Sequence, residues 1–303
     1  MPRSERANRV SVLWSVSDEL SAAHATYIVA TGGQCNDPKL EALLIDFVVQ
    51  INTRLATESL EMGPFWNEYI RQIASRIPVA NATKASLAFA GCSELQLDQT
   101  AGAIAKRLSD AREVYLRRFP RLVEQLELRG QPLRQQWDSF GAGLLLQMEK
   151  LVRDPAADQA FWSNRVQAHL IQPSRGGDGG WDADAELIWI EAMLTDADPL
   201  VPEVLRVAWL MLGLGLDLRA GDRKEASDRD VRALASVPVV LTAGMELGLC
   251  QSEPLPIETA MRLWGIGSPA SAKKVRDWWN DCSDAKTPWI DSLDELTTRL
   301  SLA

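Results

Sequence analysis

The sequence predicts a mainly α-helical, α+β fold, in which a multi-helix N-terminal bundle precedes a small β-hairpin or sheet packed on a buried helix. Apolar residues recur at three- and four-residue steps through most of the first 155 residues, as on one face of a helix. Beyond Phe161 the chain instead carries short aliphatic and aromatic runs and then one almost wholly apolar stretch. We therefore expect a helical region over 1–155 and an α+β region over 156–303, cut near Asp154-Pro155 or continuous as one domain.

Two residues predict where the first long helix starts. Asp37 is a favourable N-cap, and Pro38 follows at the first helical position. Seven apolar residues then share one helix face: Leu40, Leu43, Leu44, Phe47, Val48, Ile51 and Leu55.

Further helices follow along this region. One starts after Gly63-Pro64 and ends before Pro78, and another starts near Ser93 and is interrupted at Pro120. We expect a turn at Gly130-Gln131-Pro132, after which an antiparallel helix returns.

A small sheet is expected over 165–194. Two runs with strand-like composition, "RVQAHLIQ" and "ELIWIEAML", flank a glycine- and aspartate-rich stretch. This stretch contains Asp178, Asp182 and Asp184, so it is open to three interpretations: a phosphate loop, a calcium loop, or a turn. A phosphate loop needs a following helix N-terminus, and calcium loops of the repeat type need many copies. We therefore favour strand, turn, strand, with these aspartates as weak metal candidates and no metal predicted.

A buried helix is expected over 202–218, since nearly every residue after Arg206 is apolar and such a helix is buried on all sides. A charged loop, "RAGDRKEASDRD", then precedes several C-terminal helices. Arg206 needs a carboxylate or solvent, and the nearest strand carboxylates in the sequence are Glu186 and Glu191. This is either a buried ion pair or a ligand-binding arginine.

The chain has 11 tryptophans, which are either core anchors or the lining of a ligand groove. Trp278 and Trp279 are adjacent, and neighbouring helix residues cannot share one face. One of them is therefore expected to reach a second surface and is a ligand-binding candidate, together with Arg206, Glu186 and Glu191.

Composition and missing motifs restrict the chemistry. A net charge of -9 disfavours nucleic acid and anionic membranes as partners, and the polar N-terminus predicts no secretory signal. Four scattered cysteines fit free thiols in the cytoplasm. The two histidines, His24 and His169, are far apart, and HExxH, GxSxG, the P-loop motif and CxxC are all missing. No cofactor and no catalytic residue are predicted.

The order of elements over 165–218 resembles the core of zincin metallopeptidases, in which a strand, a turn and an edge strand precede a helix. In that family the helix carries HExxH and the edge strand lies along the substrate cleft. Here the corresponding helix reads "LRVAWLM", so the resemblance carries over no metal ligand and no general base. It implies a pseudoenzyme.

Three functions remain open. The first is a non-catalytic cytoplasmic scaffold or interaction protein with an unknown protein partner and an unknown oligomeric state. The second is a small-molecule-binding module with a tryptophan-lined pocket. The third is a hydrolase that uses carboxylates alone, for which Asp182, Asp184, Glu186 and Glu191 are candidates.

Overall fold

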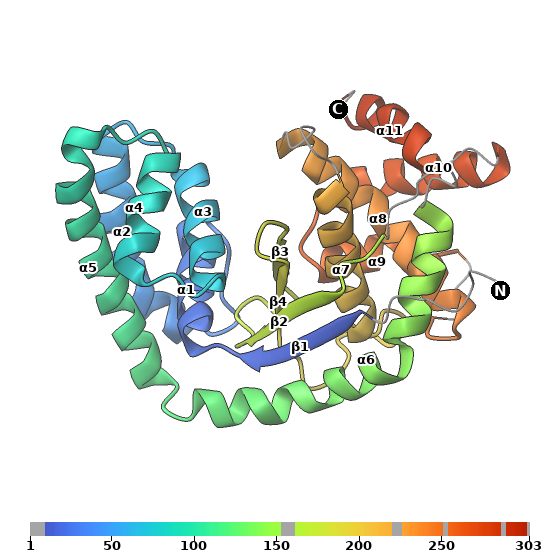
Figure 1. Ribbon diagram of the computed structural model, residues 1–303, viewed down its shortest axis with the longest axis horizontal. Coiled ribbons are helices and arrows are strands. Elements are labelled where there is room, and N and C mark those ends of the chain that lie inside the picture. Colours follow the sequence, from blue (N-terminus) through green and yellow to red (C-terminus); the bar gives the residue numbers. More distant parts are fainter. Residues whose placement is uncertain (1–9, 153–160, 220–225, 251–253, 286–288, 302–303) are drawn as a thin grey trace. The chain divides into compact units, whose positions relative to one another are not determined.

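The computed structural model describes residues 10–152, 161–219, 226–250, 254–285 and 289–301. It is mainly helical with one four-stranded mixed sheet, which confirms the predicted α+β class (Figure 1). The chain divides into two compact units. Unit 1 holds residues 1–14, 129–168 and 177–303, and unit 2 holds 15–128 and 169–176. The boundary expected near Asp154-Pro155 lies outside the described residues.

Unit 2 consists mainly of helices, which are α1 (Asp18–Ala30), α2 (Pro38–Thr57), α3 (Met62–Ala74), α4 (Val79–Phe89) and α5 (Glu94–Arg118). The predicted start of α2 is confirmed, because the Asp37 carboxylate accepts from the backbone N–H groups of Lys39 and Leu40 at 3.0 and 3.3 Å. The buried face of α2 packs mainly on α5 and α1. It consists of Leu40, Leu44, Val48, Ile51 and Leu55.

Helix α6 (Leu122–Val152) corrects one prediction. The break at Pro120 is confirmed, since α5 ends at Arg118 and α6 begins at Leu122. The turn expected at Gly130-Gln131-Pro132 is wrong, because α6 continues through Pro132. The proline removes one hydrogen-bond donor, whereas Leu126, Leu133 and Trp137 along the same helix are all buried. Packing therefore outweighs the local break signal.

The sheet has the strand order β1-β2-β4-β3. Its strands are β1 (Ser11–Val16), β2 (Arg165–Ile171), β3 (Gly179–Asp182) and β4 (Leu187–Glu191). Strand β1 was not predicted, because the first 155 residues were interpreted as helical. Backbone bonds from Ser11 to Asn164 and from Ser17 to Leu170 keep the same offset, so β1 and β2 are parallel.

The glycine- and aspartate-rich stretch forms a strand as well as a turn. It supplies β3, which pairs antiparallel with β4 so that Trp181 faces Ile188. The predicted single turn between two strands is therefore wrong, and the tight turn lies later, at 183–186. Glycine serves close packing here, because a Cβ at Gly180 would lie 2.3 Å from the Trp189 ring.

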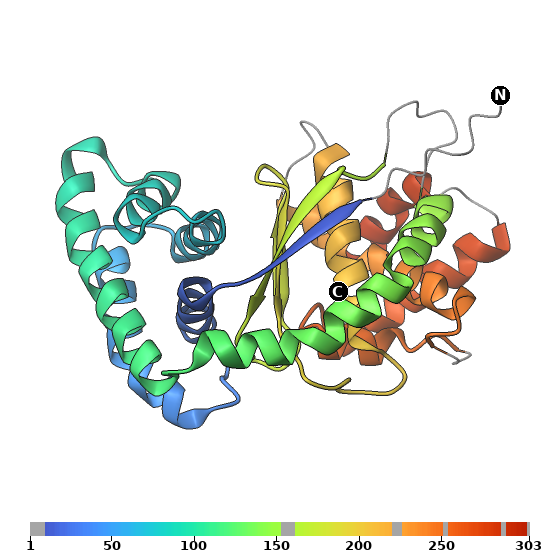
Figure 2. The ribbon, with the colours of Figure 1, turned by 60° about the horizontal axis from the view of Figure 1, so that its bottom comes forward.

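Helix α7 (Glu203–Arg219) packs on β3 and β4 (Figure 1, Figure 2). It is buried from Glu203 to Asp217, which confirms the predicted helix buried on all sides. The elements that follow are α8 (Ala226–Glu246), α9 (Ile257–Leu263), α10 (Pro269–Ala285), the 3-10 helix η2 (Trp289–Ser292) and α11 (Leu293–Ser301). Helix α8 begins inside the segment expected to be a charged loop, of which 220–225 lie outside the described residues. Of the helices described here, none is long and apolar enough to span a bilayer.

The tryptophans act mainly as core anchors, since nine of the 11 are buried. In unit 1, Trp181, Trp209 and Trp264 form a chain of ring contacts at centroid distances of 5.4 and 5.5 Å. The Trp181 indole also donates to the buried Asp217 carboxylate at 2.8 Å, and the Arg229 guanidinium lies over the Trp181 ring. These contacts join β3, α7 and α8 in one core.

Candidate functional site

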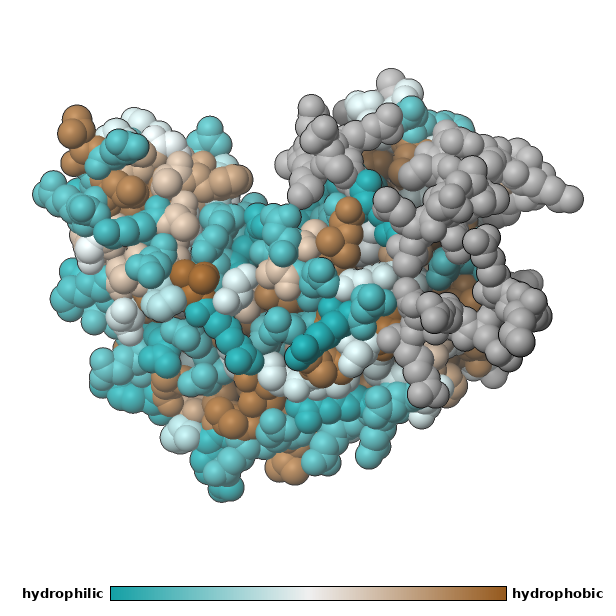
Figure 3. Space-filling model, viewed as in Figure 1, coloured by the Kyte–Doolittle hydropathy of each residue, from teal (hydrophilic) through white to brown (hydrophobic). Residues whose placement is uncertain are grey.

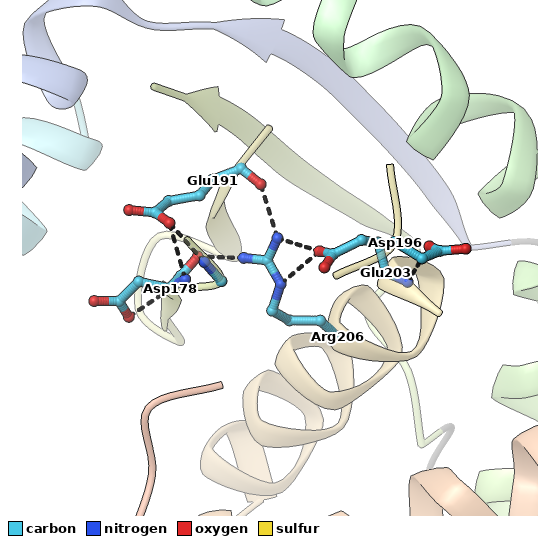
Figure 4. A network of polar contacts seen from close by, with 7 residues as sticks. Asp178, Glu191, Asp196, Glu203 and Arg206 are labelled. Carbon is cyan, nitrogen blue, oxygen red and sulfur yellow. Dashed lines mark hydrogen bonds and ion pairs between the residues drawn. The ribbon is translucent and has the colours of Figure 1, made fainter. Parts of the chain in front are cut away.

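Arg206 lies at the centre of a polar network in unit 1 (Figure 4). It is in the first turn of α7, where the helix faces β4 and the chain that leads into β3. The side chain is 1% exposed, although it carries a permanent charge. A charge this deeply buried requires hydrogen-bonding partners in the protein.

The Arg206 guanidinium has three partners. Its Nε donates to the Glu203 carboxylate at 3.0 Å, and its Nη2 also donates to that carboxylate. Nη2 further donates to the Glu191 main-chain oxygen at 2.8 Å, and Nη1 donates to the Asp178 main-chain oxygen. One side chain thus ties α7 to the end of β4 and to the residue before β3.

The predicted ion pair with Glu186 or Glu191 is wrong, because the carboxylate partner is Glu203. Glu203 precedes Arg206 by three residues, so the two lie on the same helix face. Asp196 completes this end of α7 by accepting from the Glu203 backbone N–H at 2.8 Å. The spacing of Glu203 and Arg206 was the sequence signal that could have identified this pair.

Glu191 has a separate role in the same network. Its fully buried carboxylate accepts from the backbone N–H groups of Gly177 and Asp178, at 2.8 and 3.2 Å. Gly177 has φ +138, and a Cβ there would lie 2.3 Å from the Leu263 main-chain oxygen. The carboxylate therefore holds a conformation that only glycine adopts readily.

Of the three aspartates named as metal candidates, Asp178 and Asp182 cap local backbone, and Asp184 contributes its backbone N–H to one of these caps. Asp178 accepts from the Gly179 N–H at 2.7 Å, and Asp182 accepts from the Asp184 N–H at 2.9 Å. Asp178 precedes β3 and Asp182 ends it, so their backbones are about 13 Å apart along the strand. Over the described part of the chain, no group of three or more His, Cys, Asp or Glu side chains is placed to hold a metal ion.

Glu186 lies away from Arg206, beside a pocket of about 410 Å³ in unit 1. It is exposed in the β3–β4 turn with φ +49, and it accepts a hydrogen bond from the Ser163 hydroxyl. Arg219 lines the same pocket, with its guanidinium 4.4 Å from the centroid of the Phe161 ring. The pocket also includes Trp162 and Arg165, which the sequence did not identify as site residues.

Trp278 and Trp279 differ in burial, as their adjacency predicts. Trp278 is fully buried, and its indole donates to the Ser292 main-chain oxygen at 2.9 Å. Trp279 is half-buried, with its ring centroid 6.0 Å from that of Trp278. Trp278 therefore anchors α10 to the segment before α11, and Trp279 is the one that reaches a second surface.

No family model, curated protein or solved structure matches the chain.

Unit 2 contains one strongly perturbed imidazole. His169 is buried, and its Nδ1 lies 2.7 Å from the Ser15 hydroxyl. Burial, and then the nearby charge of Arg76, lowers the pKa of His169 to about 4. The imidazole is therefore neutral at pH 7.

All four cysteines carry free thiols, as predicted. Burial raises the pKa of both the Cys92 and the Cys250 thiols, so neither is an activated nucleophile.

Proposed function

We propose that the protein is a non-catalytic cytoplasmic scaffold or interaction protein, in which a zincin-like remnant serves as a structural core. The observation that carries the proposal is the Arg206 network. In the zincin-like arrangement the helix would follow an edge strand and present catalytic side chains toward the sheet, whereas β4, the strand before α7, lies between β2 and β3 and is not an edge strand. Here that position holds a buried arginine whose guanidinium is engaged by Glu203 and by two main-chain oxygens.

The stretch "LRVAWLM", which stands where the resemblance would place the catalytic motif, supports the same proposal. The residues Leu205 to Met211 of α7 are all buried, and they pack as core. A helix that is enclosed in this way stabilises a fold and has little room for a substrate. This part of α7 would then stabilise the fold, and a partner would bind elsewhere on the protein.

Native mass spectrometry of gently purified full-length protein tests this proposal. We expect the mass of the bare chain or a clean multiple, or a complex with another protein in a fixed ratio that can be rebuilt from the two purified components. A stoichiometric metal ion would refute it, as would a peptide-hydrolysis activity that a point substitution removes.

The pocket beside Glu186 favours a second candidate, a small-molecule-binding module. Its volume of about 410 Å³ lies in the range of ligand pockets, and Trp162, Arg165 and Arg219 give it aromatic and cationic groups. Tryptophan fluorescence, measured against a panel of small carboxylates and phosphates, tests this candidate. A shift that Arg219→Ala abolishes would support it, and an unchanged spectrum across the panel would refute it.

A further inference from the structure

The pocket beside Glu186 in unit 1 has a closely packed aromatic floor. Phe161 and Trp162 line the pocket and are only 5% and 8% exposed. Both rings pack against α7, since a Cβ at Gly215 would lie 3.1 Å from Phe161 and 3.3 Å from Trp162. Leu218, near the end of α7, adds an apolar side chain that is 40% exposed. A ligand in this pocket can therefore bury an apolar group.

Opposite charges line the same pocket without pairing. Both Arg165 and Glu186 are exposed. Within the described part of the chain, Arg165 has no ion-pair partner, and the Glu186 carboxylate accepts a hydrogen bond only from Ser163. Arg219 is already engaged, because its Nη1 donates to the Phe161 main-chain oxygen at 2.7 Å. Arg165 and Glu186 are therefore the cation and the anion that are most available to a ligand.

These two charges favour a small ligand that carries both signs. An inorganic phosphate would be attracted by Arg165 but repelled by Glu186, and a simple ammonium ion would meet the reverse. A free amino acid carries a carboxylate and an ammonium on one carbon, so each group can form a charge-assisted hydrogen bond. Over the coloured part of the face in Figure 3, hydrophobic residues are scattered among hydrophilic ones, so that part offers a large apolar partner little continuous surface.

We propose that the pocket binds a free amino acid with an apolar side chain. The ligand carboxylate pairs with Arg165, the ligand ammonium pairs with Glu186, and the apolar side chain lies on the aromatic floor. The inference rests on the second candidate of the proposed function, the small-molecule-binding module, and names its class of ligand.

Isothermal titration calorimetry of the full-length chain tests this proposal. Leucine, methionine and phenylalanine carry both charges. N-acetyl-leucine keeps only the carboxylate, as the C-terminus of a protein does, and leucinamide keeps only the ammonium, as an N-terminus does. We expect at least one of the three amino acids to bind. Leucine should bind about tenfold more tightly than either capped compound, because each cap removes a hydrogen bond between charged groups.

Two variants assign the charges to their partners. Glu186→Gln should weaken leucine binding about tenfold and leave N-acetyl-leucine unchanged, because that compound has no ammonium. Arg165→Gln should weaken leucine and N-acetyl-leucine and leave leucinamide unchanged. Arg117→Gln is the matched control, since Arg117 is a 69% exposed arginine on α5 in unit 2, and it should leave all ligands unchanged.

The outcomes separate this inference from the candidate function on which it rests. A capped compound that binds as tightly as leucine would overturn the amino-acid inference, as would leucine binding that neither variant weakens. Binding of simple carboxylates or phosphates but of none of the three amino acids would also overturn it, and would leave the small-molecule candidate standing. No binding by the amino acids, the carboxylates or the phosphates would overturn both.

Discussion

Replacing Arg206 with methionine should destabilise the protein strongly. The substitution keeps most of the side-chain volume but leaves the buried Glu203 carboxylate without its cation. It also removes the donor from the main-chain oxygens of Asp178 and Glu191. Breaking a buried ion pair by removing one partner costs about 3–5 kcal/mol, and we expect Arg206→Met to fall in that range.

A matched control separates burial from charge. Arg121 pairs with Glu124 across the same three-residue spacing, but their side chains are 75% and 66% exposed. An exposed pair of this kind contributes less than about 1 kcal/mol, so Arg121→Met should change the stability only slightly. The double variant Arg206→Met/Glu203→Leu removes both charges and should recover part of the loss, because the buried carboxylate is no longer unpaired.

Urea unfolding followed by circular dichroism gives the free energies, and hydrogen exchange at Gly177 and Asp178 reports the local effect. We expect faster exchange at these two amides in Arg206→Met, since the chain before β3 loses one of its ties to α7. A loss below about 1 kcal/mol would refute this account of Arg206 as a buried structural cation. The double variant being less stable than Arg206→Met would refute the role assigned to Glu203.

Three other outcomes are expected. The pKa of His169 is about 4 in the folded protein and ~6.5 in the unfolded chain. The neutral imidazole therefore contributes its full share to the stability above pH ~6.5, and this share is lost as pH falls, because the unfolded chain binds the proton more readily. The free energy of unfolding should therefore be about 2 kcal/mol lower at pH 5 than at pH 7. In His169→Asn this part of the decrease should disappear. Gly177→Ala should cost about 2 kcal/mol or more in urea unfolding, because φ is +138 and the new Cβ would clash with the Leu263 main-chain oxygen. Gly102→Ala should instead stabilise by about 0.5–1 kcal/mol, because Gly102 lies inside α5 with nothing within 4 Å of the new Cβ, and an unchanged Tm would contradict this.

Elements whose signals are local could be predicted from the sequence. Asp37 and Pro38 fix the start of α2 through side-chain capping and a preset φ, both of which act within a few residues. The buried α7 follows from a run of apolar residues that leaves no polar side to face water. In both cases the segment itself contains the information.

Elements that depend on distant partners were missed. In β1, Val12, Trp14 and Val16 alternate with smaller or exposed residues, but the strand exists because β2 pairs with it about 150 residues later. In β3 the glycines read as a turn, although Gly180 is needed because the Trp189 ring packs against its backbone. Gly130 and Pro132 were likewise interpreted without the packing that keeps α6 continuous. Local propensity is a weak guide where tertiary contacts decide.

The candidate site residues also divide into those that the local sequence predicts and those that depend on the folded structure. A buried cation was predictable, because an arginine in an apolar helix must be paired. Its partner was sought on the preceding strand, whereas the shortest connection was Glu203, one turn back on the same helix. Glu191 was named for its charge, yet its carboxylate is occupied by the N–H groups of Gly177 and Asp178, and only its main-chain oxygen meets Arg206. Residue type thus identified Arg206 and Glu191 as members of the network, but it missed Glu203 and wrongly included Glu186, because only the folded structure shows which groups meet.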